Sequence, residues 1–385
     1  LILFTALSVS SVIAADASDI ASDFSDGKKN IICIAHRGDW HSFPENSAEA
    51  INAAAEYDAV SVDIRLTADG KPVLMADEKV DRMSVDGEGK SVSGKVSSFT
   101  LAQLKELYLR ESNGGTDKKK TTCRIPELKE IYETAAGRTA VMLNVQENDL
   151  KTVYDYVKAL GKLDETVFRI NAKPKKIIEL TKDLDGVNVT GNYQGNIIFL
   201  ATSAVKKYFA ANIYTIEMGS TNGNGVLYDN FLMKRFVGSK RAMVSMVNGR
   251  CGKRADNETG WDDLISRGYS VIETDFPAEL TEYIRKTETA ATDLEKNIDI
   301  YANTDLSPYT SETEKTTLDG RSSFSELTDA RSALQSAHDS LKVGAKKNVA
   351  LKFRFTPVRI IAVVLCAAAF TGGTLFLRSK RESTA

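Results

Sequence analysis

Short apolar runs alternate with amphipathic helical segments from residue 30 to residue 286, and this alternation limits the folds open to the chain. The runs have the length and composition of buried β-strands. They lie at residues 31–35, 59–65, 72–76, 139–145, 165–170, 187–190, 196–200, 211–217, 241–247 and 270–274. The segments at residues 100–109, 125–136, 149–160 and 174–184 have helical spacing, and the first opens with the spacing of a capping box at Thr100. Strand–helix alternation over roughly 250 residues predicts an α/β barrel rather than an open sheet.

Composition and local motifs exclude several classes of function. The 385 residues carry a formal net charge of −2, from 50 Lys and Arg against 52 Asp and Glu. This balance gives no support for a nucleic-acid partner, because such a partner is held largely through neutralised phosphates. No GxGxxG or GxxxxGK loop follows the first expected strand, which excludes the common nucleotide-binding folds. The four cysteines show no metal-ligand spacing, and a disulfide between Cys123 and Cys251 remains open.

The two ends of the chain predict export and a membrane anchor. Residues 1–15 are small and apolar, as in a truncated signal peptide, and residues 16–29 read as a polar, flexible linker. Residues 360–377 are an uncharged run that would span about 27 Å as a helix, close to the thickness of a bilayer core. Basic residues follow at once, so we expect residues 378–385 in the cytoplasm and the barrel outside it. A buried helix is the alternative interpretation of this run.

Residues 287–343 differ in character from the barrel segment. They contain no strand-like run, and Leu294, Ile298 and Tyr301 recur at helical spacing. Together with the run Asp329–Leu334 they resemble the FIVAR helical modules of bacterial surface proteins, which implies a spacer and a cell-surface or cell-wall partner. Residues 344–359 form a basic linker between this module and the expected membrane helix.

Charged residues gather where the first two expected strands end. His36 and Arg37 follow the first strand, Glu45 lies in the loop after them, and Asp63 lies on the second strand. A histidine can transfer a proton, an arginine fork can hold a phosphate oxygen, and a carboxylate suits a hard divalent cation. The structural alternatives are that His36 caps a strand and that Asp63 pairs with Arg37 or Arg65.

The order and spacing of these residues resemble the glycerophosphodiester phosphodiesterase family. The resemblance lies in Ile34–Gly38, Pro44–Ser47, Val62–Val73, Asp81-Arg82, Arg124–Leu128 and Val271–Pro277. It implies a TIM-type (β/α)8 barrel at residues 30–286 that acts on glycerophosphodiesters with Ca²⁺ or Mg²⁺. By the same resemblance His36 and Arg37 are catalytic, Arg37 and Glu45 bind substrate, and Asp63 is a metal ligand.

Three positions depart from the family pattern. Ser61 stands where the family has a metal-binding glutamate, and Ala76 stands where it has a second catalytic histidine. Our alignment places Gln146 at the remaining metal-binding glutamate, with Glu147 pointing the other way. Metal affinity falls with the number of charged ligands, and loss of one proton-transfer group removes roughly 10²–10⁴ in rate. We therefore expect weak metal binding or no cofactor, and impaired hydrolysis.

These observations leave three hypotheses. The first is a membrane-anchored barrel that binds a phosphodiester or another anionic small molecule with little or no turnover. The second is an active metal-dependent hydrolase with a rearranged site, in which His41 or Asp77 substitutes for a lost group. The third is a surface interaction protein that uses the barrel as a scaffold.

Overall fold

The predicted TIM-type barrel is confirmed. The computed structural model describes residues 16–25, 30–194, 198–219, 241–247, 251 and 254–302. Within these residues, the parallel strands are β1 (Ile32–His36), β2 (Ala59–Leu66), β7 (Ala140–Val145), β8 (Thr166–Ile170), β9 (Val189–Gln194), β10 (Thr215–Gly219), β11 (Arg241–Ser245) and β12 (Tyr269–Thr274). They follow one another around a closed sheet, because β1 pairs in parallel with both β2 and β12.

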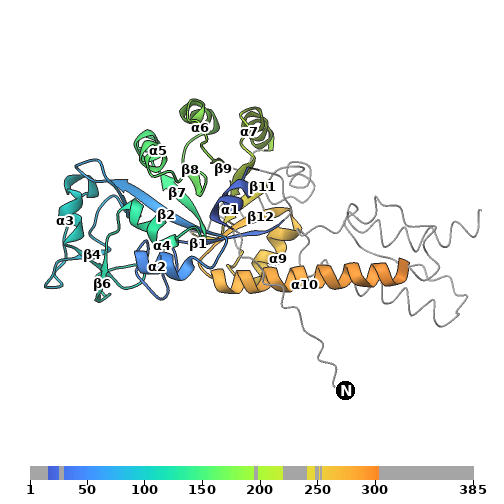
Figure 1. Ribbon diagram of the computed structural model, residues 1–385, viewed down its shortest axis with the longest axis horizontal. Coiled ribbons are helices and arrows are strands. Elements are labelled where there is room, and N and C mark those ends of the chain that lie inside the picture. Colours follow the sequence, from blue (N-terminus) through green and yellow to red (C-terminus); the bar gives the residue numbers. More distant parts are fainter. Residues whose placement is uncertain are drawn as a thin grey trace, which may run out of the picture.

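Helices cover the outside of this barrel (Figure 1). They are α2 (Ala48–Ala54), α4 (Leu128–Ala135), α5 (Leu150–Ala159), α6 (Pro174–Thr181), α7 (Ile198–Ala210), α9 (Glu258–Ser266) and α10 (Pro277–Ala302). The strand predicted at residues 196–200 is wrong, because α7 begins at Ile198. A short apolar run fits a buried strand and a buried helix equally well, so its sequence alone did not separate the two.

A small antiparallel insertion separates β2 from α4. It comprises β3 (Pro72–Leu74), β4 (Ser84–Val85), η1 (Val96–Ser98), α3 (Leu101–Lys105), β5 (Tyr108–Arg110) and β6 (Lys120–Arg124). The predicted capping box at the start of α3 is confirmed, with Thr100 and Gln103 bonded to each other's backbone. Cys123 lies in the apolar core of this insertion and is a free thiol, as is Cys251, so these two cysteines form no disulfide.

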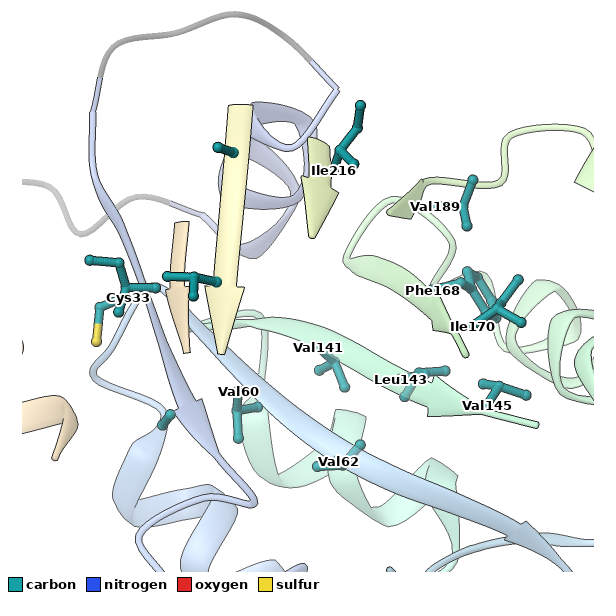
Figure 2. Packing of buried hydrophobic residues seen from close by; sticks show 14 of the residues in the cluster. Cys33, Val60, Val62, Val141, Leu143, Val145, Phe168, Ile170, Val189 and Ile216 are labelled. Carbon is teal, nitrogen blue, oxygen red and sulfur yellow. The ribbon is translucent and has the colours of Figure 1, made fainter. Parts of the chain in front are cut away.

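The barrel strands alternate between two apolar layers. One set of side chains, including Cys33, Val60 and Leu143, packs outward into the large core shared with the helices (Figure 2). The intervening residues, such as Ile34 and Met142, belong to a second cluster. This period of two is the intrinsic geometry of a strand, and it decides which side chains face the barrel axis.

Helix α1 (Ala17–Asp23) closes one end of the barrel, so this part of the predicted flexible linker at residues 16–29 is an ordered helix instead. Ile20, Ala21 and Phe24 are buried with inward residues of the strands. The Asp16 side chain caps the helix by accepting the Ser18 N–H. The segment is polar in average composition, but its few apolar residues share one face, and that face supplies the burial that an isolated short helix lacks.

Truncating a buried side chain at the end of α1 should destabilise the barrel. Phe24 is 1 % exposed, so Phe24→Ala should lower the free energy of unfolding by about 3–5 kcal/mol, because it leaves a cavity in the second cluster. Phe24→Leu keeps most of the volume and should cost under about 1.5 kcal/mol. Urea unfolding of both variants checks the difference; equal, small losses would mean that α1 does not seal the barrel.

Asp58 gives the barrel a pH-dependent stability. Its carboxylate accepts the Cys33 N–H at 2.8 Å, and burial raises its pKa to about 6, which the charges of Glu288 and Asp23 reinforce. Because the pKa of Asp58 is higher in the folded chain than in the unfolded chain, its protonation stabilises the fold fully at a pH below the unfolded pKa. This contribution is lost as the pH rises through 6. The free energy of unfolding of Asp58→Asn should therefore exceed that of the wild type by up to about 3 kcal/mol at pH 8. The two values should converge near pH 4. Denaturant unfolding across this range checks the sign; a constant difference would refute it.

Helix α10 runs without a break through the boundary predicted at residue 286, so the barrel and the first helical residues of the predicted module share one helix. The predicted signal peptide, the rest of the module (303–343), the basic linker (344–359), the membrane helix (360–377) and the tail (378–385) lie outside the described residues. Among the helices that the structure describes, none combines the length and the apolar character of a membrane span.

Candidate functional site

Polar side chains replace the apolar inward residues toward the carboxyl ends of the barrel strands. The positions that follow the second apolar cluster in steps of two include His36, Asp63, Asn144, Arg169 and Glu273, and Glu217 follows the buried Thr215 of β10 in the same way. Because all eight strands are parallel, these ends meet at one mouth of the barrel. The mouth is therefore the candidate functional site.

His36 is oriented by an acidic side chain that follows β12, the last strand of the barrel, which pairs with β1. Its Nδ1 lies 2.8 Å from Asp275 Oδ1, just beyond β12, and the Trp40 indole donates to the same oxygen at 2.8 Å. Burial alone would raise the pKa of Asp275, but its bonds with His36 and Trp40 hold that pKa below the usual value. Pairing at Nδ1 fixes the ring and leaves Nε2 as the nitrogen for a ligand.

Two arginines meet at one buried carboxylate beside His36. Glu45, 3 % exposed, accepts from Arg37 at 3.0 Å and from Arg82 at 2.6 Å. Arg82 is also held by Asp77, at 2.7 and 3.1 Å. The side chains of Arg37 and Arg82 are 22 % and 31 % exposed, so an anion from solvent can still reach them. Glu45 itself contacts the arginines, and its role as a direct substrate ligand remains a prediction.

The predicted metal ligand Asp63 is already surrounded by N–H donors. Arg37 Nε lies 2.8 Å from Oδ2, Asn46 Nδ2 donates to the same oxygen at 3.2 Å, and Asn144 Nδ2 donates to Oδ1 at 3.1 Å. Of the two structural alternatives for Asp63, the structure shows the pairing with Arg37. The residue opposite Asp63 on β7 is Asn144, whereas Gln146 lies exposed past the end of that strand.

These residues do not fit the divalent cation that the resemblance implies. A hard cation needs several oxygen ligands, and charged ones give most of the affinity. Both oxygens of Asp63 accept hydrogen bonds, from Asn46 and Asn144, and Oδ2 also forms an ion pair with Arg37. Over residues 16–302, as far as these are described, no three acidic, histidine or cysteine side chains are grouped to hold a metal ion.

Arg169 links two other carboxylates across the barrel mouth. Its Nε and Nη2 donate to Glu217 at 2.8 and 2.6 Å, and its Nη1 donates to both oxygens of Glu273 at 3.0 and 2.9 Å. Ser61, which stands at the family's glutamate position, donates to Glu273 Oε1 at 2.6 Å. The network thus connects strands β2, β8, β10 and β12.

The remaining predicted positions have structural partners. The Ala76 carbonyl accepts from Arg65 at 2.6 Å, and the methyl group at this position offers no proton-transfer group. His41 lies on the loop that carries Trp40, with ring centroids 3.9 Å from Trp40 and 5.1 Å from Phe276. Asp77 is engaged by Arg82. His41 and Asp77 therefore lie near the mouth in aromatic and ionic contacts of their own.

Sequence reasoning missed Arg169, Glu217 and Asp275. A signal was available for the first two, because each follows a buried residue of the same strand by two positions, Val167 and Thr215. Asp275 lies within the run that resembles the family's last strand, yet its pairing with His36 spans 239 positions and needs the closed barrel. No local pattern encodes such a contact.

Comparison with known proteins agrees with the fold and the motifs. Residues 36–248 match the Glycerophosphoryl diester phosphodiesterase family. A glycerophosphodiester phosphodiesterase of Caldanaerobacter subterraneus is 33 % identical over 260 residues, which cover 66 % of this chain and 98 % of the relative. Mouse glycerophosphodiester phosphodiesterase 1 is 40 % identical over 167 residues, covering 39 % of this chain and 48 % of that protein.

Solved structures share the same fold. A glycerophosphoryl diester phosphodiesterase from Parabacteroides distasonis superimposes with a TM-score of 0.54 at 19 % identity, covering 70 % of this chain and 91 % of the other. An Oleispira antarctica phosphodiesterase, solved with its product sn-glycerol-3-phosphate, gives 0.50 at 18 % identity, covering 65 % and 95 %. With its barrel, its His36-Arg37 motif and these relatives, the chain belongs to the glycerophosphoryl diester phosphodiesterase family.

Proposed function

We propose that the barrel mouth binds a glycerophosphodiester or a related anionic small molecule and hydrolyses it slowly or not at all. The observation that carries the proposal is the pair of partly exposed guanidiniums, Arg37 and Arg82, held on the buried Glu45 next to His36. Planar guanidiniums bind phosphate oxygens through paired, charge-assisted hydrogen bonds. The naming of the Caldanaerobacter relative as a glycerophosphodiester phosphodiesterase supports the ligand class.

The expectation of poor turnover follows from the groups around His36. Cleaving a phosphodiester needs a base for the attacking oxygen and an acid for the leaving oxygen. His36 with Asp275 can supply one of these roles. Ala76 cannot supply the other, and Asp77 is engaged by Arg82. Absence of one proton-transfer group lowers the rate by roughly 10²–10⁴.

One observation favours the second candidate, an active hydrolase with a rearranged site. The Asp275 carboxylate holds His36 at Nδ1, the arrangement that a general base requires, and leaves Nε2 for the reacting group. In that case the single imidazole would serve both proton transfers in turn, taking the proton of the attacking oxygen and giving it to the leaving oxygen.

Binding and turnover of the full chain with glycerophosphocholine separate the two candidates. We expect calorimetry to detect binding that Arg37→Ala weakens at least about tenfold, with little or no release of sn-glycerol-3-phosphate. Lys119→Ala is the matched control, because it removes an exposed cation of the neighbouring insertion. Product release that His36→Ala abolishes would favour the hydrolase. Absence of binding by the wild type would overturn both candidates.

We further propose that the chain is exported and anchored through residues 360–377, with the barrel outside the cytoplasm. The support is the apolar run and the basic residues after it. Carbonate extraction should leave the full chain in the membrane fraction, and a variant ending at residue 355 should be released. Protease added to intact cells should digest the barrel; full protection would contradict the proposed location.

A further inference from the structure

The centre of the barrel mouth contains a cation that belongs to the chain itself. Arg169 reaches inward from β8 and donates to Glu217 on β10 and Glu273 on β12, with donor–acceptor distances between 2.6 and 3.0 Å. All three guanidinium nitrogens are used. The planar fork of an arginine matches two carboxylates on different edges, a geometry that a lysine ammonium cannot reproduce.

Two buried carboxylates in one place require a nearby positive charge. The side chains of Glu217 and Glu273 are 2 % and 1 % exposed, and an unpaired carboxylate at such depth is strongly unfavourable. Burial by itself would raise the pKa of Glu273, but Arg169 reverses this effect and holds that pKa well below its usual value. The Glu273 carboxylate therefore remains ionised because the Arg169 guanidinium lies beside it.

Glu217 and Glu273 could supply ligands to a metal ion if the Arg169 guanidinium were absent. Two carboxylates with the Ser61 hydroxyl beside them are oxygen donors of the kind that Ca²⁺ accepts, with water completing the shell. Asp63, the ligand expected from the family resemblance, is separately engaged by Arg37. Among the described residues, the place where acidic groups converge on the barrel axis is thus already occupied.

We propose that Arg169 is an internal cation that takes the place of a divalent metal at the barrel mouth, and that the chain binds its ligand without one. Exclusion of the metal follows from the Glu217–Arg169–Glu273 contacts alone. Only the metal-independent binding of the ligand rests on the proposed function. The proposal implies a latent cation site that appears when the arginine is removed.

Thermal unfolding and calorimetry of the full chain with Ca²⁺ or Mg²⁺ alone test this proposal. The wild type should show the same Tm in EDTA and in millimolar metal, and no saturable heat of binding. Arg169→Ser should have a lower Tm in EDTA and regain about 5 °C at a hundredfold excess of Ca²⁺ over its Kd. Arg169→Lys keeps the positive charge and should show no response to metal.

A double variant identifies the ligands. Adding Glu273→Gln to Arg169→Ser should abolish the response to Ca²⁺, because one of the two carboxylates is lost. Saturable metal binding by the wild type that Glu273→Gln or Asp63→Asn removes would overturn the proposal, and so would a folded Arg169→Ser variant indifferent to both metals. If Arg169→Ser does not fold, the wild-type titration decides alone.

A separate measurement tests whether the chain binds its ligand without a metal ion. Affinity for glycerophosphocholine should be unchanged, within about twofold, between EDTA and millimolar Ca²⁺. A large loss of ligand affinity in EDTA would contradict metal-independent binding. A wild type that binds neither metal nor glycerophosphocholine would end the proposed function and leave the internal cation intact, so the two failures are distinguishable.

Discussion

Replacing Gly38 by alanine should lower the free energy of unfolding by about 2–5 kcal/mol and distort the candidate site. Gly38 has φ +79°, a conformation that L side chains rarely adopt. An added Cβ would lie 2.6 Å from the Ala50 carbonyl carbon and 2.9 Å from its Cβ. Those atoms belong to helix α2, so relief of the clash must move the helix away from the loop that carries Arg37.

Gly70→Ala is the matched control for this prediction. Gly70 has φ +72°, and its added Cβ would meet nothing within 4 Å. It should therefore show the backbone cost alone, about 1–2 kcal/mol. Urea unfolding of both variants measures the difference, which isolates the contact with α2. Equal losses at the two positions would show that the loop after β1 is free to move away from the helix.

Neutralising Glu45 should make the protein less stable and its anion binding stronger at the same time. Glu45→Gln keeps the shape but removes the charge that Arg37 and Arg82 share, which should cost about 2–3 kcal/mol in the absence of ligand. The two guanidiniums then keep only Asp63 and Asp77 as counter-charges, so inorganic phosphate should bind on the order of tenfold more tightly. Phosphate should raise the Tm of the variant more than that of the wild type.

Asp77→Asn provides the comparison for this prediction. Asp77 also pairs with Arg82, but its side chain is 41 % exposed, so water can replace the lost charge and the change in stability should be under about 1 kcal/mol. If phosphate shifts the Tm of Glu45→Gln and of the wild type equally, anions do not bind at Arg37 and Arg82. That result would also remove the main support for the proposed ligand class.

The barrel and much of its mouth were predictable because local patterns encode them. Alternating apolar runs gave β1, β2 and β12, and the residues after β1 correctly indicated the end at which polar groups meet. The plug α1 was missed for a physical reason. Its seven helical residues are polar on average, and only the barrel end gives Ile20 and Phe24 a surface to bury.

The electrostatics of the mouth could not be predicted, because they depend on contacts between distant strands. The sequence left open whether Asp63 binds a metal or pairs with Arg37 or Arg65, whereas the structure gives it Arg37, Asn46 and Asn144 as partners. Glu273 pairs with Arg169 across 104 positions. Which carboxylates are free and which are neutralised is settled only when the barrel closes.

Helix α10 begins beside the candidate site. It begins at Pro277, two residues after the Asp275 that orients His36, and it continues for 26 residues, about 39 Å at the usual rise. Leu280 and Tyr283 anchor its first turns on the barrel. The packing of these first turns therefore also holds the segment that carries Asp275, so the orientation of the His36 imidazole depends on a helix outside the barrel as well as on the strands that form it.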